Sequence, residues 1–263
     1  MYKTIILVYN RHIIMKEEKI MFYFLANPII SYNLFLIAAA VIPAVILMVK
    51  VYKSDRLEKE SPALMRKLVV AGILSALLAL VEEWIGEAVL NAFLEPSSTA
   101  YNVILYFIIV AFSEESSKYL LLKKRTWKNP EFNCSFDGVV YAVFVSLGFA
   151  LWENISYVMS YGFSTAIVRA VTAIPGHACF GVFMGVFYGM AKRAELHRKN
   201  GKASVLRKLS VIFPVILHGA YDYIASNESD EANIIFLGFI AVMFLCSYIL
   251  VGKHAKNDTY LTR

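Results

Sequence analysis

The chain has 263 residues, of which 59% are hydrophobic, with a formal net charge of +6 and a mean hydropathy of +0.58. Ordinary soluble domains are about 45–50% apolar, so the composition excludes that class and predicts an all-α, polytopic transmembrane helix bundle. The positive charge does not indicate a nucleic-acid partner, because the basic residues gather in short loops between apolar runs. The expected surroundings are the lipid bilayer.

The N-terminal segment does not contain a span. The apolar run 5–9 is too short to cross a bilayer, and charged residues between positions 11 and 19 interrupt the next stretch of the chain. No small-residue cleavage site comes after a signal-like apolar region. We expect residues 1–28 to form an interfacial or dispensable extension, with a later methionine as an alternative start.

Seven apolar segments come next, each long enough to cross the hydrocarbon core. They cover 29–51, 67–94, 100–122, 136–159, 164–191, 207–226 and 232–252. Together they predict a single membrane domain, residues 29–252. The loops after the first, third and fifth spans are basic, whereas the alternate loops are nearly free of Lys and Arg. The positive-inside rule therefore places the C-terminal tail, residues 253–263, in the cytoplasm of a cell-membrane protein.

The third span carries Glu114, Glu115 and Lys118. A charged side chain at the centre of a membrane helix costs about 2.5–3.5 kcal/mol, so such groups generally face a polar interior. The spacing of three and four residues lets Lys118 pair with one carboxylate, which leaves the other in excess. An excess carboxylate suits a general base; the alternative interpretation is a buried structural ion pair.

Acidic residues also occur in the second and fourth spans. Glu83 and Glu87 share one helix face in the outer half of the second span, where they are either functional or simply close to the interface. Glu153 in the fourth span is a ligand, a polar tether to another helix, or a group near the outer surface. Ser135 or Asp137 is expected to be the N-cap of that span.

The fifth and sixth spans each carry one histidine. His177 lies on a stripe of residues four apart, which continues through Gly181 and Gly185, and small residues at this spacing allow close helix packing. Pro175 predicts a kink beside His177. His218 and Asp222 share a face, so the carboxylate can orient the imidazole. His177 could instead bond a carbonyl of a neighbouring helix.

The predicted topology brings these groups to one layer. At 1.5 Å per residue, Glu114, Glu115, His177 and His218 all lie within about 8 Å of mid-depth. We therefore expect a site between spans three and six, where two carboxylates and two imidazoles activate a water molecule.

The same residue types suit a divalent metal such as zinc, with Glu115, Glu153, His177 and His218 as candidate ligands. The sequence does not decide whether a metal is required, although the absence of an HExxH pattern weakens the zinc interpretation. A proton- or ion-coupled transporter would use the same groups, but no repeat relates the two halves of the chain. A catalytically silent scaffold or immunity protein would not need the full set of Glu, His and Asp.

Several motifs match one known family in order and spacing. They are Tyr52-Lys53-Ser54-Asp55-Arg56 with Glu58 and Glu60 after the first span, Glu114-Glu115-x-x-Lys118, Phe136-Asp137-Gly138-x-x-Tyr141, Gly148-Phe149-Ala150-x-x-Glu153-Asn154-x-x-Tyr157, His177, and His218-Gly219-x-Tyr221-Asp222. Over about residues 25–225 the chain resembles the PrsW intramembrane proteases, which belong with the CAAX prenyl endopeptidases and bacteriocin-immunity proteins.

The resemblance implies a peptidase that makes the first cut in a membrane-anchored, single-span protein such as an anti-sigma factor. It implies that Glu114 and Glu115 are the essential acidic pair. By analogy with the prenyl endopeptidases, one of these glutamates and His177 activate water, while His218 with Asp222 stabilises the oxyanion. The residues expected to support the site are Lys118, Glu153, Asn154 and Asp137.

Overall fold

The structure, a computed structural model, describes residues 27–227 and 229–261. The predicted N-terminal extension therefore lies almost entirely outside the described residues. The described chain is helical, with no β-strand and only an isolated β-bridge between Cys134 and Tyr260. Six helices, with 163–196 taken as one, are long and apolar enough to cross a membrane. They are α2 (Pro28–Ser54), α3 (Pro62–Phe93), α6 (Asp137–Tyr161), α7 with α8 (Phe163–Val171 and Ala173–Leu196), α9 (Asn200–Ala225) and α10 (Asp230–Lys256). The all-α membrane class is confirmed.

The third predicted span is a chain of three helical segments rather than one α-helix. They are α4 (Thr99–Val103), the π-helix η1 (Ile104–Val110) and α5 (Ala111–Thr126). The π-helix ends one turn before Glu114, and insertions of this kind occur frequently at functional sites. Gly219 lets α9 approach η1 closely, because a Cβ atom there would lie 2.5 Å from the ring of Phe107.

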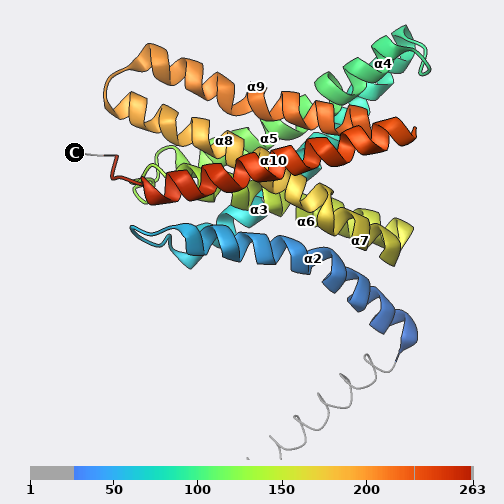
Figure 1. The fold of residues 1–263 in the computed structure, drawn as a ribbon, viewed down its shortest axis with the longest axis horizontal. Helices are drawn as coiled ribbons and strands as arrows, with labels where there is room; N and C mark the ends of the chain where they lie inside the picture. Colours follow the sequence, from blue (N-terminus) through green and yellow to red (C-terminus); the bar gives the residue numbers. More distant parts are fainter. Residues whose placement is uncertain (1–26, 228, 262–263) are drawn as a thin grey trace, which may run out of the picture.

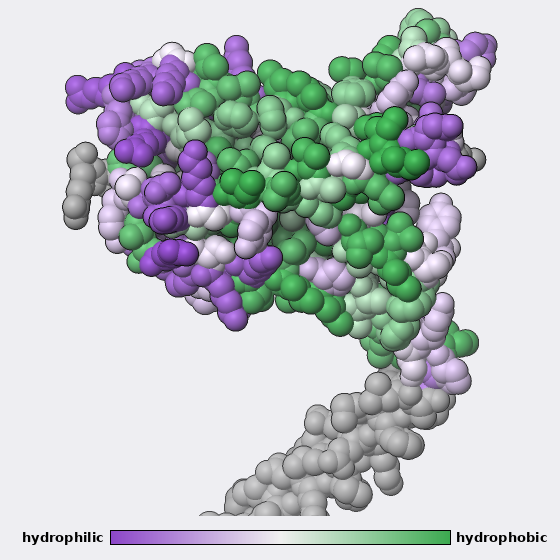
Figure 2. All heavy atoms as spheres, in the orientation of Figure 1, coloured by the Kyte–Doolittle hydropathy of each residue, from purple (hydrophilic) through white to green (hydrophobic). Residues whose placement is uncertain are grey.

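The helices run along one common direction, and their connections gather at two ends (Figure 1). One end holds the loops 55–61, 127–136 and 197–199 together with the C-terminus, and we call it the basic end. The turns between α3 and α4, α6 and α7, and α9 and α10 lie at the opposite end. Figure 2 shows hydrophilic residues at the two ends and a hydrophobic band between them, as expected for a protein that spans a bilayer.

Helix α6 forms the centre of the bundle, with every residue from 136 to 150 buried. It packs against α2, α3 and α8. The contact with α8 depends on glycine, because a Cβ at Gly185 would lie 2.5 Å from the carbonyl oxygen of Gly138. The predicted close packing of the small-residue stripe is therefore confirmed.

Two local predictions have different outcomes. The fifth span breaks at Thr172, between α7 and α8, which confirms the kink expected from Pro175. The N-cap of α6 is Phe136, so the prediction of Ser135 or Asp137 was wrong. Asp137 instead accepts hydrogen bonds from the N–H groups of Asn133 and Cys134, in the turn before the helix.

Candidate active site

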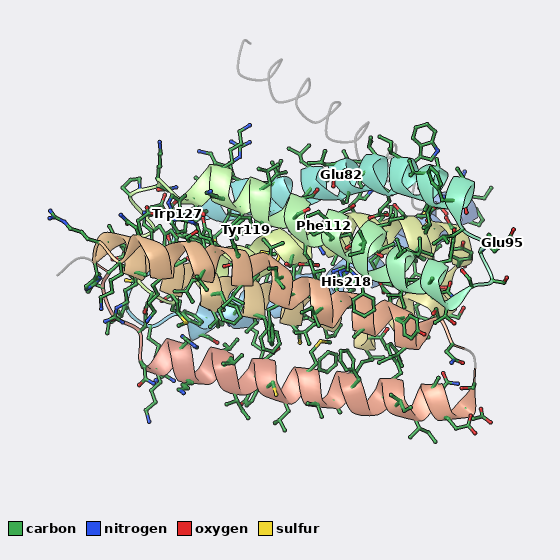
Figure 3. The ribbon with its side chains drawn as sticks, turned by 90° about the horizontal axis from the view of Figure 1, so that it is seen from above. Glu82, Glu95, Phe112, Tyr119, Trp127 and His218 are labelled. Carbon is green, nitrogen blue, oxygen red and sulfur yellow. The ribbon has the colours of Figure 1, made fainter. Side chains whose placement is uncertain are left out.

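The predicted acidic and imidazole groups meet about halfway along the bundle. Figure 3 shows His218 in the interior, between Trp127 near the basic end and Glu95 at the opposite end. Glu114 and Glu115 come from α5, His177 from α8 and His218 from α9, and all four are buried. The sequence prediction of one shared layer therefore matches the arrangement in the structure.

Lys118 joins the two glutamates. Its Nζ donates hydrogen bonds to Glu114 Oε2 at 3.0 Å and to Glu115 Oε1 at 2.7 Å. It also lies 3.2 Å from His177 Nδ1 and 3.9 Å from the ring centroid of Phe149. Lys118 thus contacts both carboxylates, not the single one expected from helix spacing, and one ammonium group compensates two buried negative charges.

His218 lies between two carboxylates. Its Nδ1 is 3.0 Å from Glu115 Oε1, and its Nε2 is 3.2 Å from Asp222 Oδ2. The ring of Phe180 stacks on the imidazole at 4.6 Å. Because carboxylates accept hydrogen bonds, a His218 that donates from both nitrogens is an imidazolium. Asp222 therefore does what the one-turn spacing predicted, and holds the ring in place.

His177 begins a second polar chain. Its Nε2 lies 2.7 Å from Glu153 Oε2, and Arg169 Nη2 lies 3.1 Å from the same oxygen. Arg169 Nε donates to Asn154 Oδ1 at 2.8 Å, and Asn154 Nδ2 donates to the backbone carbonyl of Ala40 in α2 at 2.8 Å. Of the three interpretations that the sequence left open for Glu153, the structure shows the tether.

A cavity of about 750 Å³ opens beside this network. Its wall includes Glu114, His177, His218 and Asp222, whereas Glu115 is fully buried and is not part of the wall. Further wall residues come from α3, α7, α9 and α10, so the cavity extends from the carboxylate pair toward the opposite end.

The structure also shows cavity residues that the sequence did not place at the site. Glu83 and Glu87 line the wall from α3, and Arg169 lines it from α7. The four-residue spacing of Glu83 and Glu87 was the available signal, but it did not show which helix they face. Asp137 is not brought to this site, because it lies near the basic end, at the start of α6.

One group of side chains here matches the donor set of a metal site. Ligand atoms of Glu114, Glu115 and His218 all lie within 4.8 Å of one another. The second oxygen of Glu115, Oε2, is buried and has no hydrogen-bond partner among the described residues. Two carboxylates and an imidazole are ordinary zinc ligands, so these residues fit a divalent metal. The other two predicted ligands, Glu153 and His177, pair with each other instead.

Comparison with known proteins identifies the family of the chain. The model of the PrsW family intramembrane metalloproteases matches residues 60–251. A protein named Protease PrsW from Shouchella clausii is 31% identical over 84% of this chain and 97% of its own length. Its namesake from Halalkalibacterium halodurans is 32% identical over 80% and 92%, and that from Bacillus subtilis is 30% identical over 74% and 84%. No solved structure matches the chain. The protein is a multi-pass membrane peptidase, and the chain belongs to the PrsW family of intramembrane metalloproteases.

Proposed function

We propose that the protein hydrolyses a peptide bond of a membrane-anchored protein in the cavity, with Glu114, Glu115, His177, His218 and Asp222 as its catalytic machinery. The observation that carries the proposal is the cavity wall, which presents a carboxylate, two imidazoles and the aspartate that orients one of them. Peptide hydrolysis needs a base for water and positive charge or donors for the oxyanion, and this wall supplies both.

Glu114 is the proposed general base. It lines the cavity, and Lys118 binds its Oε2, so Oε1 is the oxygen that can accept a proton from water. Glu115 is less suited to this step, because it is fully buried and its Oε1 accepts hydrogen bonds from both Lys118 and His218. Glu115 holds the positive groups in position, and this assigns different roles to the two glutamates.

The two imidazoles take different roles because their partners differ. An ammonium group can only donate hydrogen bonds, so Nδ1 of His177 accepts from Lys118 and its Nε2–H donates to Glu153. This pairing gives a neutral ring that helps to position water beside Glu114. His218, between two carboxylates, carries positive charge toward the cavity and stabilises the oxyanion that forms on the scissile carbonyl.

A divalent metal would bind at one particular group of these residues. Glu114, Glu115 and a His218 that has given up one ring proton would hold it, and a divalent ion there would replace the imidazolium in polarising the scissile carbonyl and would acidify a bound water molecule. Lys118 then neutralises the remaining carboxylate charge. The chain's own residues orient the substrate in either case, since Arg169 and Asp222 lie on the same wall.

The proposed substrate is a single-span membrane protein, such as an anti-sigma factor. The cut is on the side of the membrane where the opposite end of the bundle lies, away from the basic end. The basic loops at the other end favour a cytoplasmic C-terminus, and the cavity extends away from them. Cysteines introduced at Ser97 and at Gly201 should react with a membrane-impermeant thiol reagent from outside and inside, respectively. The opposite labelling pattern would refute this orientation.

The activity is tested by comparing the membrane proteomes of cells that carry wild-type protein, Glu114→Gln or Glu82→Gln. Glu82 lies on α3 and only accepts a hydrogen bond from Ser117, outside the cavity wall, so it is a matched control. We expect an uncut single-span protein to accumulate with Glu114→Gln only. The purified wild type should then cleave that protein in detergent, and cleavage by Glu114→Gln at the wild-type rate would refute the assignment of the base.

A further inference from the structure

A second acidic cluster lies at the basic end, away from the cavity. It consists of Asp55 and Glu60 from the loop between α2 and α3, together with Asp137 at the start of α6. Their exposed fractions are 3%, 2% and 0%, and one carboxylate oxygen from each lies within 4.8 Å of the others. None of the three residues is part of the cavity wall.

Much of the hydrogen-bonding capacity of these carboxylates is unused. Both oxygens of Asp55, Oε1 of Glu60 and Oδ1 of Asp137 are buried without a hydrogen-bond partner in the described chain. A buried polar atom without a partner costs about 1–3 kcal/mol, and more when it is charged. Asp55 in particular is a buried carboxylate with no hydrogen-bond partner on either oxygen in the described chain, and one of its oxygens lies within 4.8 Å of an oxygen of each of the other two carboxylates.

No ion pair compensates this charge. Within residues 27–227 and 229–261, no Lys or Arg forms an ion pair with Asp55, Glu60 or Asp137. The ammonium group of Lys59 donates to the backbone carbonyls of Tyr52 and Asp55, and it attracts the Asp55 carboxylate without forming an ion pair with it. Asp258, from the C-terminal segment, adds a fourth negative charge near Asp55. The Glu, Asp and Lys side chains of this region therefore carry a net negative charge.

The electrostatics agree with a missing positive charge. Burial raises the pKa of Asp55 above its ordinary value; the positive charge of Lys59 opposes this shift, and the negative charge of Asp258 adds to it. Burial, with a smaller contribution from Glu131, raises the pKa of Glu60 to about 7. Both shifts show that the negative charge is unfavourable where it stands, and a bound cation or protonation would relieve it.

We propose that Asp55, Glu60 and Asp137 bind one hard divalent cation, Mg²⁺ or Ca²⁺. All the free donor atoms are carboxylate oxygens, which these ions prefer, and no histidine is in the group. The ion ties the loop between α2 and α3 to the start of α6, the helix at the centre of the bundle. The site is structural, because it holds two segments together at a distance from the cavity.

The test uses purified full-length protein in detergent, stripped with a chelator and then titrated with Ca²⁺, Mg²⁺ or the luminescent probe Tb³⁺. Tyr52, whose hydroxyl donates to the carbonyl of Glu60 at 3.0 Å, is placed to sensitise Tb³⁺ emission. We expect saturable Tb³⁺ emission, displaced by Ca²⁺ or Mg²⁺, and a rise in the thermal unfolding midpoint on adding either ion. The ion that displaces Tb³⁺ at the lower concentration is the preferred one.

Four variants locate the binding. Asp55→Asn, which keeps the shape of the side chain, should weaken cation binding at least tenfold, and Glu60→Gln should repeat this result if the first variant does not fold. Glu58→Gln is the matched control, because Glu58 is an exposed residue of the same loop that only accepts a hydrogen bond from Asn133. Glu115→Gln tests the active-site group and should leave this binding unchanged.

Two outcomes would overturn the proposal. One is a wild-type protein whose midpoint and Tb³⁺ emission do not respond to any of the three ions, which would mean that the carboxyl groups are protonated. The other is binding that survives Asp55→Asn and Glu60→Gln but disappears in Glu115→Gln, which would place the ion in the cavity. Neither result depends on proteolytic activity, so failure here is separate from failure of the proposed function.

Discussion

Replacing Lys118 by Met tests whether the two buried glutamates depend on the ammonium group between them. The side chain of Lys118 is fully buried, and it lies 2.7 and 3.0 Å from two carboxylates that are themselves buried. Removing one partner of a buried ion pair costs about 3–5 kcal/mol, because the remaining charge stays in the interior. At roughly 2–4 °C per kcal/mol for a chain of this size, the unfolding midpoint should fall by roughly 6–20 °C.

A double variant separates charge compensation from loss of packing. Lys118→Met with Glu115→Gln removes one negative charge along with the positive one, so it should recover at least half of the lost stability. Peptide hydrolysis should be lost in both variants, since each lacks the ammonium group that holds Glu114, and the double variant also lacks the charge of Glu115 beside His218. The assays are thermal unfolding in detergent and cleavage of a substrate identified from the proteome comparison. Lys67→Met, at an exposed lysine of α3, is the control.

The coupling between the two substitutions decides the result. If the destabilisation of the double variant equals the sum of the two single ones, Lys118 does not compensate Glu115 and the reasoning is refuted. A negative coupling of at least about 1 kcal/mol, meaning a double variant more stable than the sum predicts, is the expected outcome.

Three further predictions rest on individual contacts. Gly185→Ala should destabilise the protein by about 1–3 kcal/mol, because the new methyl group meets the backbone of α6. The control is Gly252→Ala in α10, which has open space around it and should be neutral or stabilising. Equal thermal unfolding midpoints for the two variants would contradict the packing argument. Arg169→Lys should lower kcat roughly 10- to 100-fold with little change in the thermal unfolding midpoint, since lysine keeps the charge near Glu153 but loses the hydrogen bond to Asn154. Single-turnover cleavage measures the change in rate. Asp222→Asn should lower kcat roughly 10- to 100-fold through the loss of the carboxylate that orients the imidazole, and an unchanged kcat would show that this orientation is not needed.

The fold class could be predicted from the sequence because hydrocarbon imposes one simple rule. Apolar segments of sufficient length must be helices there, since every backbone polar group needs a partner within its own segment. The same rule does not reveal the internal geometry of a helix. The division of the third span into α4, η1 and α5 depends on packing against α9, where Phe107 meets Gly219, and no local pattern in residues 99–126 indicates it.

The candidate site was predictable to the extent that it depends on depth and helix face. Charged residues are so costly in the membrane that Glu114, Glu115 and the two intramembrane histidines can be recognised from the sequence as candidates for the site. The sequence does not show in this way which side chains pair across neighbouring helices. The distances between Glu153 and Arg169, and between Lys118 and His177, depend on how α5, α6, α7 and α8 are rotated about their axes, which spacing along one helix cannot give.

The position of the cavity answers the main physical difficulty of hydrolysis within a membrane, which is the supply of water. Water enters hydrocarbon only along polar groups, and the wall carries Glu83, Glu87 and Arg169 between the catalytic layer and the opposite end. On the side of the basic end, the first half of α6, from Asp137 to Ala150, is buried. Water and the scissile bond should therefore arrive from the same side. In the proposed mechanism, a substrate helix that enters the cavity must also unwind locally, since its peptide carbonyl has to leave its own helix before His218 can stabilise the oxyanion.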